Sequence, residues 1–173
     1  MDITIRRVTQ EDKAEWLRMR KGIWPEAPDE YLNFDMDEIL ADDNYMVIFA
    51  CDGDKPIGLT EAQIKGSAEG CETSPVGYLE GWFVQDDYRG KSVVGIMTRA
   101  AEDWIRGKGC TEVASDTWLD NESSIRAHVK MGYVEVETAR TLRKAIVGFV
   151  CAILRAKDVK YGEMLEKTGA GFR

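Results

Sequence analysis

The chain has 173 residues, of which 44% are hydrophobic and 31% charged, and its formal net charge at pH 7 is −8. A chain of this length corresponds to about one domain and can bury a sizeable core without metals or disulfides. The acidic balance argues against DNA, RNA or an anionic membrane as the main partner, because each of these needs a basic protein face. The same balance suits a cationic small molecule as the substrate.

The cysteines and the single histidine exclude two further classes. The cysteines are Cys51, Cys71, Cys110 and Cys151. None forms a C-x-x-C pair, and with one histidine the chain has no zinc-site spacing, so we expect no metal and four reduced thiols. Residues 1–4 show no secretory signal, and the longest apolar run, residues 145–154, is about half a membrane span. We therefore expect a soluble, cytoplasmic protein.

The first half of the chain predicts a strand, then two helices, then a β-hairpin of two strands. Residues 3–8 alternate as in a strand, and Thr9 is a candidate N-cap for a helix that ends before Pro25. A second helix is predicted over residues 28–40. Strands are then predicted at residues 45–51 and 57–64, joined by a tight turn.

The second half predicts helices and strands in alternation. The predicted strands are residues 76–84, 111–117 and 133–138, and the predicted helices are residues 91–107 and 121–131. This order of elements is typical of an α/β layer with a mixed sheet. After Ile146 the pattern changes, and the sequence leaves open whether the tail forms a strand, a helix or an appended segment.

A glycine-containing turn joins the strand at residues 76–84 to the helix at residues 91–107. Such a turn offers unpaired backbone N–H groups and the positive end of the helix dipole, and Arg89 and Lys91 add positive charge. It predicts phosphate or pyrophosphate binding, with an ordinary strand-to-helix loop as the alternative. A nucleotide P-loop is disfavoured because Gln85 stands where that motif needs glycine, and no G-x-G-x-x-G pattern occurs.

This turn resembles the R/Q-x-x-G-x-G/A turn of the GNAT-superfamily N-acetyltransferases, which holds the coenzyme A pyrophosphate. Residues 89–94 read Arg-Gly-Lys-Ser-Val-Val, so Ser92 replaces a glycine and Val94 replaces a glycine or alanine. Further segments are similar to one subgroup, the aminoglycoside 6'-N-acetyltransferases. They are residues 20–25, 73–84, 109–117, 120–121 and 131–137. The resemblance predicts a GNAT domain over residues 1–146 and leaves residues 147–173 as a C-terminal extension.

The resemblance implies a mixed, mainly antiparallel sheet flanked by helices, acetyl-CoA as co-substrate, and a homodimer. It implies acetyl transfer to the 6'-amino group of aminoglycoside antibiotics by direct attack, and hence resistance. The coenzyme-binding residues that it implies are Trp82, Phe83, Val84, Arg89, Gly90, Lys91, Ser92, Val93, Val94, Gly95 and Asn121. The implied substrate-binding residues are Trp24, Glu80, Asp116 and Glu137. Ala27 and Ser67 replace a histidine and a tyrosine of the subgroup, so the range of drugs stays open.

Three residues are candidates for the chemistry of acetyl transfer. The attacking amine must be neutral, and a carboxylate can accept its proton directly or through water, for which Asp116 is the first candidate and Glu80 the second. A strand N–H near Phe83 or Val84 would stabilise the developing negative charge on the thioester oxygen. His128 stands where many family members carry a tyrosine that serves the leaving thiolate. No acetyl-cysteine intermediate is required.

Each candidate also has a purely structural interpretation. Glu80 fits a buried carboxylate paired with the backbone or an arginine, Asp116 fits a turn residue, and Glu137 fits a solvated strand face. His128 fits a packed or surface helical residue. Two other functions stay open: the same fold acting on another amine, in a polyamine or a protein, and a non-catalytic acyl-CoA-binding sensor.

Overall fold

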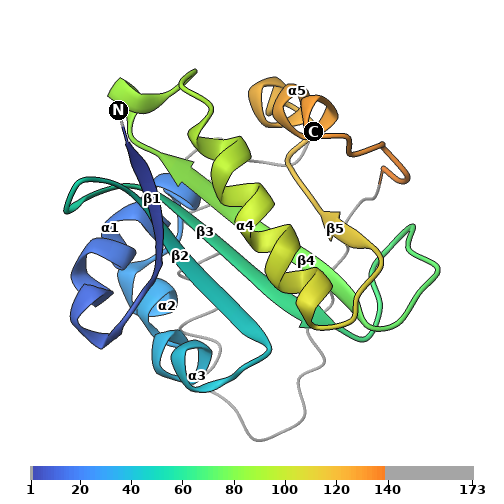
Figure 1. The fold of residues 1–173 in the computed structure, drawn as a ribbon, viewed down its shortest axis with the longest axis horizontal. Coiled ribbons are helices and arrows are strands. Elements are labelled where there is room, and N and C mark those ends of the chain that lie inside the picture. Colours follow the sequence, from blue (N-terminus) through green and yellow to red (C-terminus); the bar gives the residue numbers. More distant parts are fainter. Residues whose placement is uncertain (1, 139–173) are drawn as a thin grey trace, which may run out of the picture. The chain divides into compact units, whose positions relative to one another are not determined.

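The computed structural model describes residues 2–138, in which one five-stranded sheet lies between two layers of helices (Figure 1). In chain order the elements are β1 (Ile3–Arg7), the 3-10 turn η1 (Gln10–Asp12), α1 (Lys13–Ile23), α2 (Asp29–Asn33), α3 (Met36–Ala41), β2 (Tyr45–Asp52), β3 (Lys55–Lys65), β4 (Val76–Val84), the 3-10 turn η2 (Asp86–Tyr88), α4 (Val93–Gly107), β5 (Val113–Ser115) and α5 (Glu122–Lys130). The strand order is β1-β2-β3-β4-β5, antiparallel except for the parallel pair β4–β5. The predicted mixed, mainly antiparallel sheet is confirmed.

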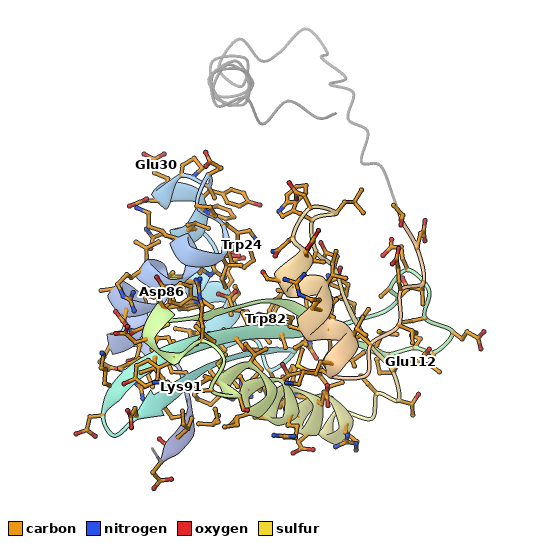
Figure 2. All side chains as sticks on the ribbon, turned by 90° about the horizontal axis from the view of Figure 1, so that it is seen from above. Trp24, Glu30, Trp82, Asp86, Lys91 and Glu112 are labelled. Carbon is orange, nitrogen blue, oxygen red and sulfur yellow. The ribbon has the colours of Figure 1, made fainter. Side chains whose placement is uncertain are left out.

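The sheet has a core on each face because its central strands are covered on both sides. In β2, Met46, Ile48 and Ala50 pack in the core that contains α4, while Val47 and Phe49 pack in the core that contains α1 and α3. This alternation follows from the two-residue period of side chains along a strand. Figure 2 shows α1 and α2 on one side of the sheet and α4 on the other. We call these sides the α1 face and the α4 face.

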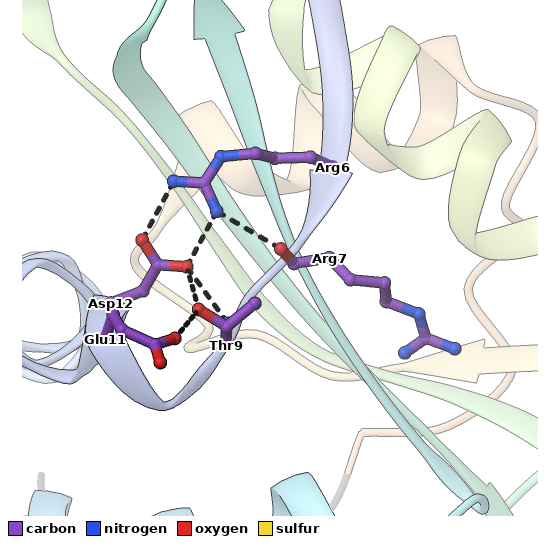
Figure 3. Close-up of polar contacts among 5 residues, drawn as sticks. All are labelled: Arg6, Arg7, Thr9, Glu11 and Asp12. Atoms are coloured by element: carbon purple, nitrogen blue, oxygen red, sulfur yellow. Dashed lines mark hydrogen bonds and ion pairs between the residues drawn. The ribbon is translucent and has the colours of Figure 1, made fainter.

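Thr9 begins the first helical segment, as predicted, but through a 3-10 turn. The Asp12 carboxylate accepts hydrogen bonds from the Thr9 amide at 2.9 Å and from the two terminal nitrogens of Arg6 at 2.7 and 2.8 Å (Figure 3). The hydrogen bonds from Arg6 lower the pKa of Asp12 to about 2. This ion pair ties β1 to the start of η1 and α1.

The single helix predicted over residues 28–40 is wrong, because the structure has α2 and α3 with a break at Phe34 and Asp35. A side chain of α1 binds at this break. Arg20 Nη1 donates to the Leu32 carbonyl oxygen at 2.7 Å and to Asp35 Oδ1 at 2.6 Å. In a continuous helix that carbonyl would accept from the amide four residues later, so its use by Arg20 accompanies the break.

The predicted last strands also differ from the structure. β5 covers only Val113–Ser115, and residues 133–138 form no strand. The alternating Val134 and Val136 are 78% and 61% exposed, so the described residues provide no sheet for them to pack on. The predicted domain boundary at residue 146 and the C-terminal extension lie outside the described residues. No helix in residues 2–138 has the length and apolar character needed to cross a membrane.

Candidate active site

A β-bulge in β4 decides which side chains face the candidate site. Ala62 of β3 pairs with Leu79 and Glu61 pairs with Gly81, so Glu80 is an extra residue without a partner on β3. Before the bulge the strand packs Gly77 against α4, since a Cβ there would lie 2.3 Å from Ile105. After the bulge Gly81 lies against the end of α1. The bulge therefore reverses the facing of the odd-numbered residues.

Five polar side chains gather on the α1 face beside this bulge. They are Gln63 and Lys65 of β3, Tyr78 and Glu80 of β4, and Asp116, which follows β5; we call them the polar cluster. Glu80 Oε1 accepts a hydrogen bond from Gln63 Nε2 and lies 2.8 Å from Lys65 Nζ. Lys65 Nζ is 3.2 Å from the centre of the Tyr78 ring, and the Tyr78 hydroxyl donates to Asp116 Oδ1 at 2.6 Å. Burial, and then the bond to Asp116, raise the pKa of Tyr78.

The structure brings together the two predicted catalytic carboxylates, Glu80 and Asp116, through Lys65 and Tyr78. These two linking residues and Gln63 were not among the sequence candidates. A signal for them existed, because polar residues recur at every second position of an otherwise apolar strand, at residues 61, 63 and 65. Their partners on β4 and after β5 had no such signal.

The other predicted substrate residues lie at different distances from this cluster. Trp24 lies close to β4 at the bulge, since a Cβ on Gly81 would be 3.5 Å from its ring (Figure 2). Glu137 is exposed in the irregular segment at residues 133–138, and within residues 2–138 no hydrogen bond or ion pair joins it to Glu80 or Asp116.

The outer edge of β4 is open along its second half. β5 pairs in parallel only with residues 77–79 of β4, while β4 continues to Val84. Trp82, Phe83 and Val84 are hydrogen-bonded to β3 on one side and have no strand on the other within the described residues. Backbone N–H and C=O groups at such an edge can pair with an extended chain that carries amides.

His128 of α5 fills the fork where β4 and β5 separate. The residue is 9% exposed, and its ring lies 4.5 Å, centre to centre, from the Trp82 ring. Nδ1 is 2.9 Å from the Ser124 carbonyl oxygen, and Nε2 is 2.9 Å from Ser115 Oγ. A carbonyl only accepts, so we assign the ring proton to Nδ1. Burial lowers the pKa of His128. Ser115 Oγ also lies 3.0 Å from the Leu79 carbonyl oxygen, so its single proton has two acceptors within reach, that carbonyl and Nε2.

Asn121, predicted to touch the coenzyme, stands at the start of α5. Its side-chain oxygen accepts from the Ser124 amide at 3.1 Å, which is the usual geometry of an N-cap. Its carbonyl oxygen is thus used by the helix, and the side-chain amide nitrogen remains available to a ligand.

The predicted anion-binding turn lies at the far end of β4, beside Asp86 and Lys91 (Figure 2). Ser92 has φ +66° and Gly90 has φ +75°, so Ser92 adopts the left-handed conformation that glycine favours. The first helical bond of α4 runs from the Ile96 amide to the Ser92 carbonyl. The three preceding amides, at residues 93–95, have no protein acceptor in the part of the chain that the structure describes. They and the helix dipole can bind an anion.

Taken together, the site offers anion-binding amides at one end of β4, an open strand edge in the middle and carboxylates at the bulge. Arg89 and Lys91 are exposed beside the amides. Among residues 2–138 no group of three histidine, cysteine, aspartate or glutamate side chains is placed to hold a metal ion. The arrangement suits a long ligand with a phosphate end and a second ligand with an ammonium group.

Comparisons with known proteins agree with this geometry. The family model "Acetyltransferase (GNAT) family" matches residues 8–133. An aminoglycoside N(6')-acetyltransferase type 1 from Klebsiella aerogenes is 37% identical over 147 residues, which are 82% of this chain and 96% of the relative. The enzyme of the same name from Stenotrophomonas maltophilia is 37% identical over 136 residues, which are 78% of this chain and 88% of the relative.

Solved structures give the same result. A structure of AAC(6')-Iy in complex with the bisubstrate analogue CoA-S-monomethyl-acetylneamine has a TM-score of 0.80 and 33% identity, over 84% of this chain and 100% of that one. The apo aminoglycoside 6'-N-acetyltransferase AAC(6')-Ig from Acinetobacter haemolyticus has a TM-score of 0.79 and 32% identity, over 83% and 99%. With this fold, this turn and these relatives, the chain belongs to the acetyltransferase (GNAT) family.

Proposed function

We propose that this chain transfers the acetyl group of acetyl-CoA to the 6'-amino group of aminoglycosides by direct attack, and so confers resistance to these antibiotics. The observation that carries the proposal is the arrangement along β4. Free amides begin α4 just after the strand, and Glu80 and Asp116 lie on the α1 face at the bulge. The relatives named for this activity align with this chain over nearly their whole length.

In this proposal the coenzyme lies along the second half of β4. The turn at residues 89–95 holds the pyrophosphate through backbone N–H groups, with Arg89 and Lys91 adding charge. The amides of the pantetheine arm pair with the open edge at Trp82, Phe83 and Val84, and Asn121 contacts the arm near the thioester. The solved relative that holds a CoA conjugate supports this placement.

The aminoglycoside would bind on the α1 face with its ammonium groups toward Glu80 and Asp116. Trp24 lines the site beside the bulge, and Glu137 contributes a further carboxylate at its margin. Asp116 is the general base, in the orientation that the Tyr78 hydroxyl gives it, and Glu80 is the second candidate. Carboxylates near the reacting amine both attract the cation and accept its proton.

The reaction is one substitution at the thioester carbon. The neutral amine nitrogen forms a bond to the acetyl carbon, the carbon–sulfur bond breaks, and the CoA thiolate leaves while the amine proton passes to Asp116 or to water. A β4 N–H near Phe83 or Val84 stabilises the oxyanion. His128 orients the thiol side of the site through Trp82, whose ring it contacts at a 44° tilt.

The first test replaces the proposed base. Asp116→Asn keeps shape and removes charge and basicity, and we expect kcat/KM for kanamycin to fall by about 10²–10⁴, the range for loss of a general base. Thiol release from acetyl-CoA measures the rate, and calorimetry with CoA should show unchanged coenzyme affinity. Asp103→Asn, in an exposed ion pair of α4, is the matched control. Wild-type rates of Asp116→Asn across pH would assign the base to Glu80.

The same assay separates the other two functions. Thiol release with spermidine or a lysine peptide, but not with kanamycin, would show a family member with another acceptor. Tight CoA binding without thiol release on any amine would show a sensor.

We also propose a cytoplasmic homodimer. The thiols of Cys51, Cys71 and Cys110 are free, which suits a reducing compartment, and the dimer rests on the resemblance to the subgroup. Light scattering of the purified chain and fractionation of expressing cells test the two statements.

A further inference from the structure

In this structure the carboxylate of Glu80 is already paired with an ammonium group. Lys65 Nζ lies 2.8 Å from Glu80 Oε1 and 3.2 Å from the centre of the Tyr78 ring. A carboxylate and an aromatic face are the two groups by which proteins bind alkylammonium ions. The lysine thus shows, within the chain, how this part of the site binds a primary ammonium.

The features of this ion pair allow the Lys65 ammonium to leave Glu80 and another cation to take its place. The side chains of Lys65 and Glu80 are 31% and 29% exposed, and one oxygen of the carboxylate makes the contact. A lysine ammonium is a strongly hydrated point charge on a flexible four-carbon stem, so it can leave for water without moving the backbone. Gln63 stays bonded to Glu80 from the same strand and keeps the carboxylate in place.

We infer that Lys65 is an internal counter-ion, which a substrate ammonium must displace from Glu80, and that Lys65 thereby sets the affinity of this enzyme for its cationic acceptor. The inference rests on the proposed function, in which Glu80 binds the aminoglycoside. Displacement replaces one ammonium by another at the same carboxylate. The acceptor therefore gains only the difference between its own contacts and those of the lysine.

Removing the lysine ammonium removes this competition. The polar cluster carries two carboxylates and one ammonium, a formal charge of −1, and Lys65→Met changes it to −2. We expect the Kd for neamine to fall by about 3- to 30-fold, the combined contribution of a partly exposed ion pair and a cation–π contact. KM should fall by the same factor, because the contact is made equally before and in the transition state.

The experiment measures neamine binding by calorimetry to protein saturated with CoA, which cannot turn over. Lys13→Met is the matched control, since Lys13 is equally exposed, pairs with Asp37 and lies at the far end of α1. Lys65→Arg keeps the charge and should stay close to wild type. Lys65→Gln repeats the test if the methionine variant does not fold. In a Glu80→Gln background, Lys65→Met should no longer tighten binding.

Unchanged or weaker neamine binding by both neutral Lys65 variants would overturn the inference, and so would equal tightening by Lys13→Met. Failure of the proposed function has a different signature, because wild type would then bind no neamine or Glu80→Gln would bind it as wild type does. Tightening that survives in the Glu80→Gln background would also overturn the inference, since the lysine would then act elsewhere.

Discussion

Two ion pairs that involve the same strand, β3, differ in burial and in the number of bonds between the partners. Glu61 is held by Arg20 of α1, and four residues further along the strand Lys65 is held by Glu80 of β4. Arg20 binds both oxygens of Glu61, at 2.7 Å each, and the two side chains are 5% and 6% exposed. Lys65 reaches one oxygen, and both partners are about one-third exposed.

The deep pair is also saturated with further hydrogen bonds. Trp16 Nε1 donates to Glu61 Oε1 at 2.6 Å, and Arg20 reaches the Leu32 carbonyl and Asp35 with its remaining nitrogen. A buried carboxylate and guanidinium are tolerable only when almost all of their donors and acceptors are used. The comparison teaches that depth and the number of bonds, rather than the residue types, separate an anchor of the fold from the pair that we propose to be exchangeable.

The largest expected effect follows from breaking the anchor. Arg20→Ala leaves the buried Glu61 without its partner, and should lower the free energy of unfolding by about 3–5 kcal/mol. Urea unfolding of wild type and variant measures it. Arg18→Ala, which removes an exposed pair with Glu15 on the same helix, should cost less than about 1 kcal/mol. Equal losses in the two variants would break the comparison.

A smaller effect comes from His128, which is buried and forms no ion pair with the residues that the structure describes. Burial lowers the pKa of the ring, so below about pH 6.5 the unfolded chain takes up a proton that the folded chain does not. The free energy of unfolding should therefore fall with decreasing pH, from about 6.5 down to the folded pKa, by at most about 1.4 kcal/mol per pH unit.

His128→Gln isolates this contribution because the chain has a single histidine. Urea unfolding at several pH values gives the free energy of unfolding of wild type and variant. The difference between the two should contain the whole pH dependence that the histidine contributes. Parallel pH profiles of the two proteins would show that the ring is as easy to protonate in the folded chain as in the unfolded chain, contrary to its lowered pKa.

The smallest expected effect sharpens the comparison from the exchangeable side. Lys65→Met should change the free energy of unfolding by less than about 1 kcal/mol, and this difference should shrink in about 1 M salt, where exposed pairs are screened. The loss in Arg20→Ala should persist in the same salt. A loss of several kcal/mol on Lys65→Met would make the second pair an anchor too.

Patterns within short stretches of the sequence were enough to predict several elements of the fold. The hairpin of β2 and β3, the strand β4 and the helix α4 follow from alternation, turn residues and helical periodicity within a short window. The break between α2 and α3 could not be predicted in this way. The break is accompanied by hydrogen bonds from Arg20, which lies on another helix, to Leu32 and Asp35.

The candidate site divides in the same way. The turn at residues 89–95 could be predicted, since glycine, cations and a helix start are adjacent in the chain. Glu80 and Asp116 were predicted through the resemblance, but the partners that occupy them were not. Lys65 is 15 residues from Glu80, and Tyr78 is 38 residues from Asp116, so only the sheet register brings each pair together.

The bulge at Glu80 makes the role of β4 depend on the number of residues in the strand as well as on which residues they are. A strand presents its residues to two sides by parity, and one additional residue reverses that parity from there onward. In a chain one residue shorter at this point, β3 and β4 would pair without interruption, and the two halves of β4 could not keep their present faces together. Glu80, whose carboxylate we propose to bind the acceptor, is thus the same residue that allows Trp82 and Leu79, three positions apart, to pack in the same core.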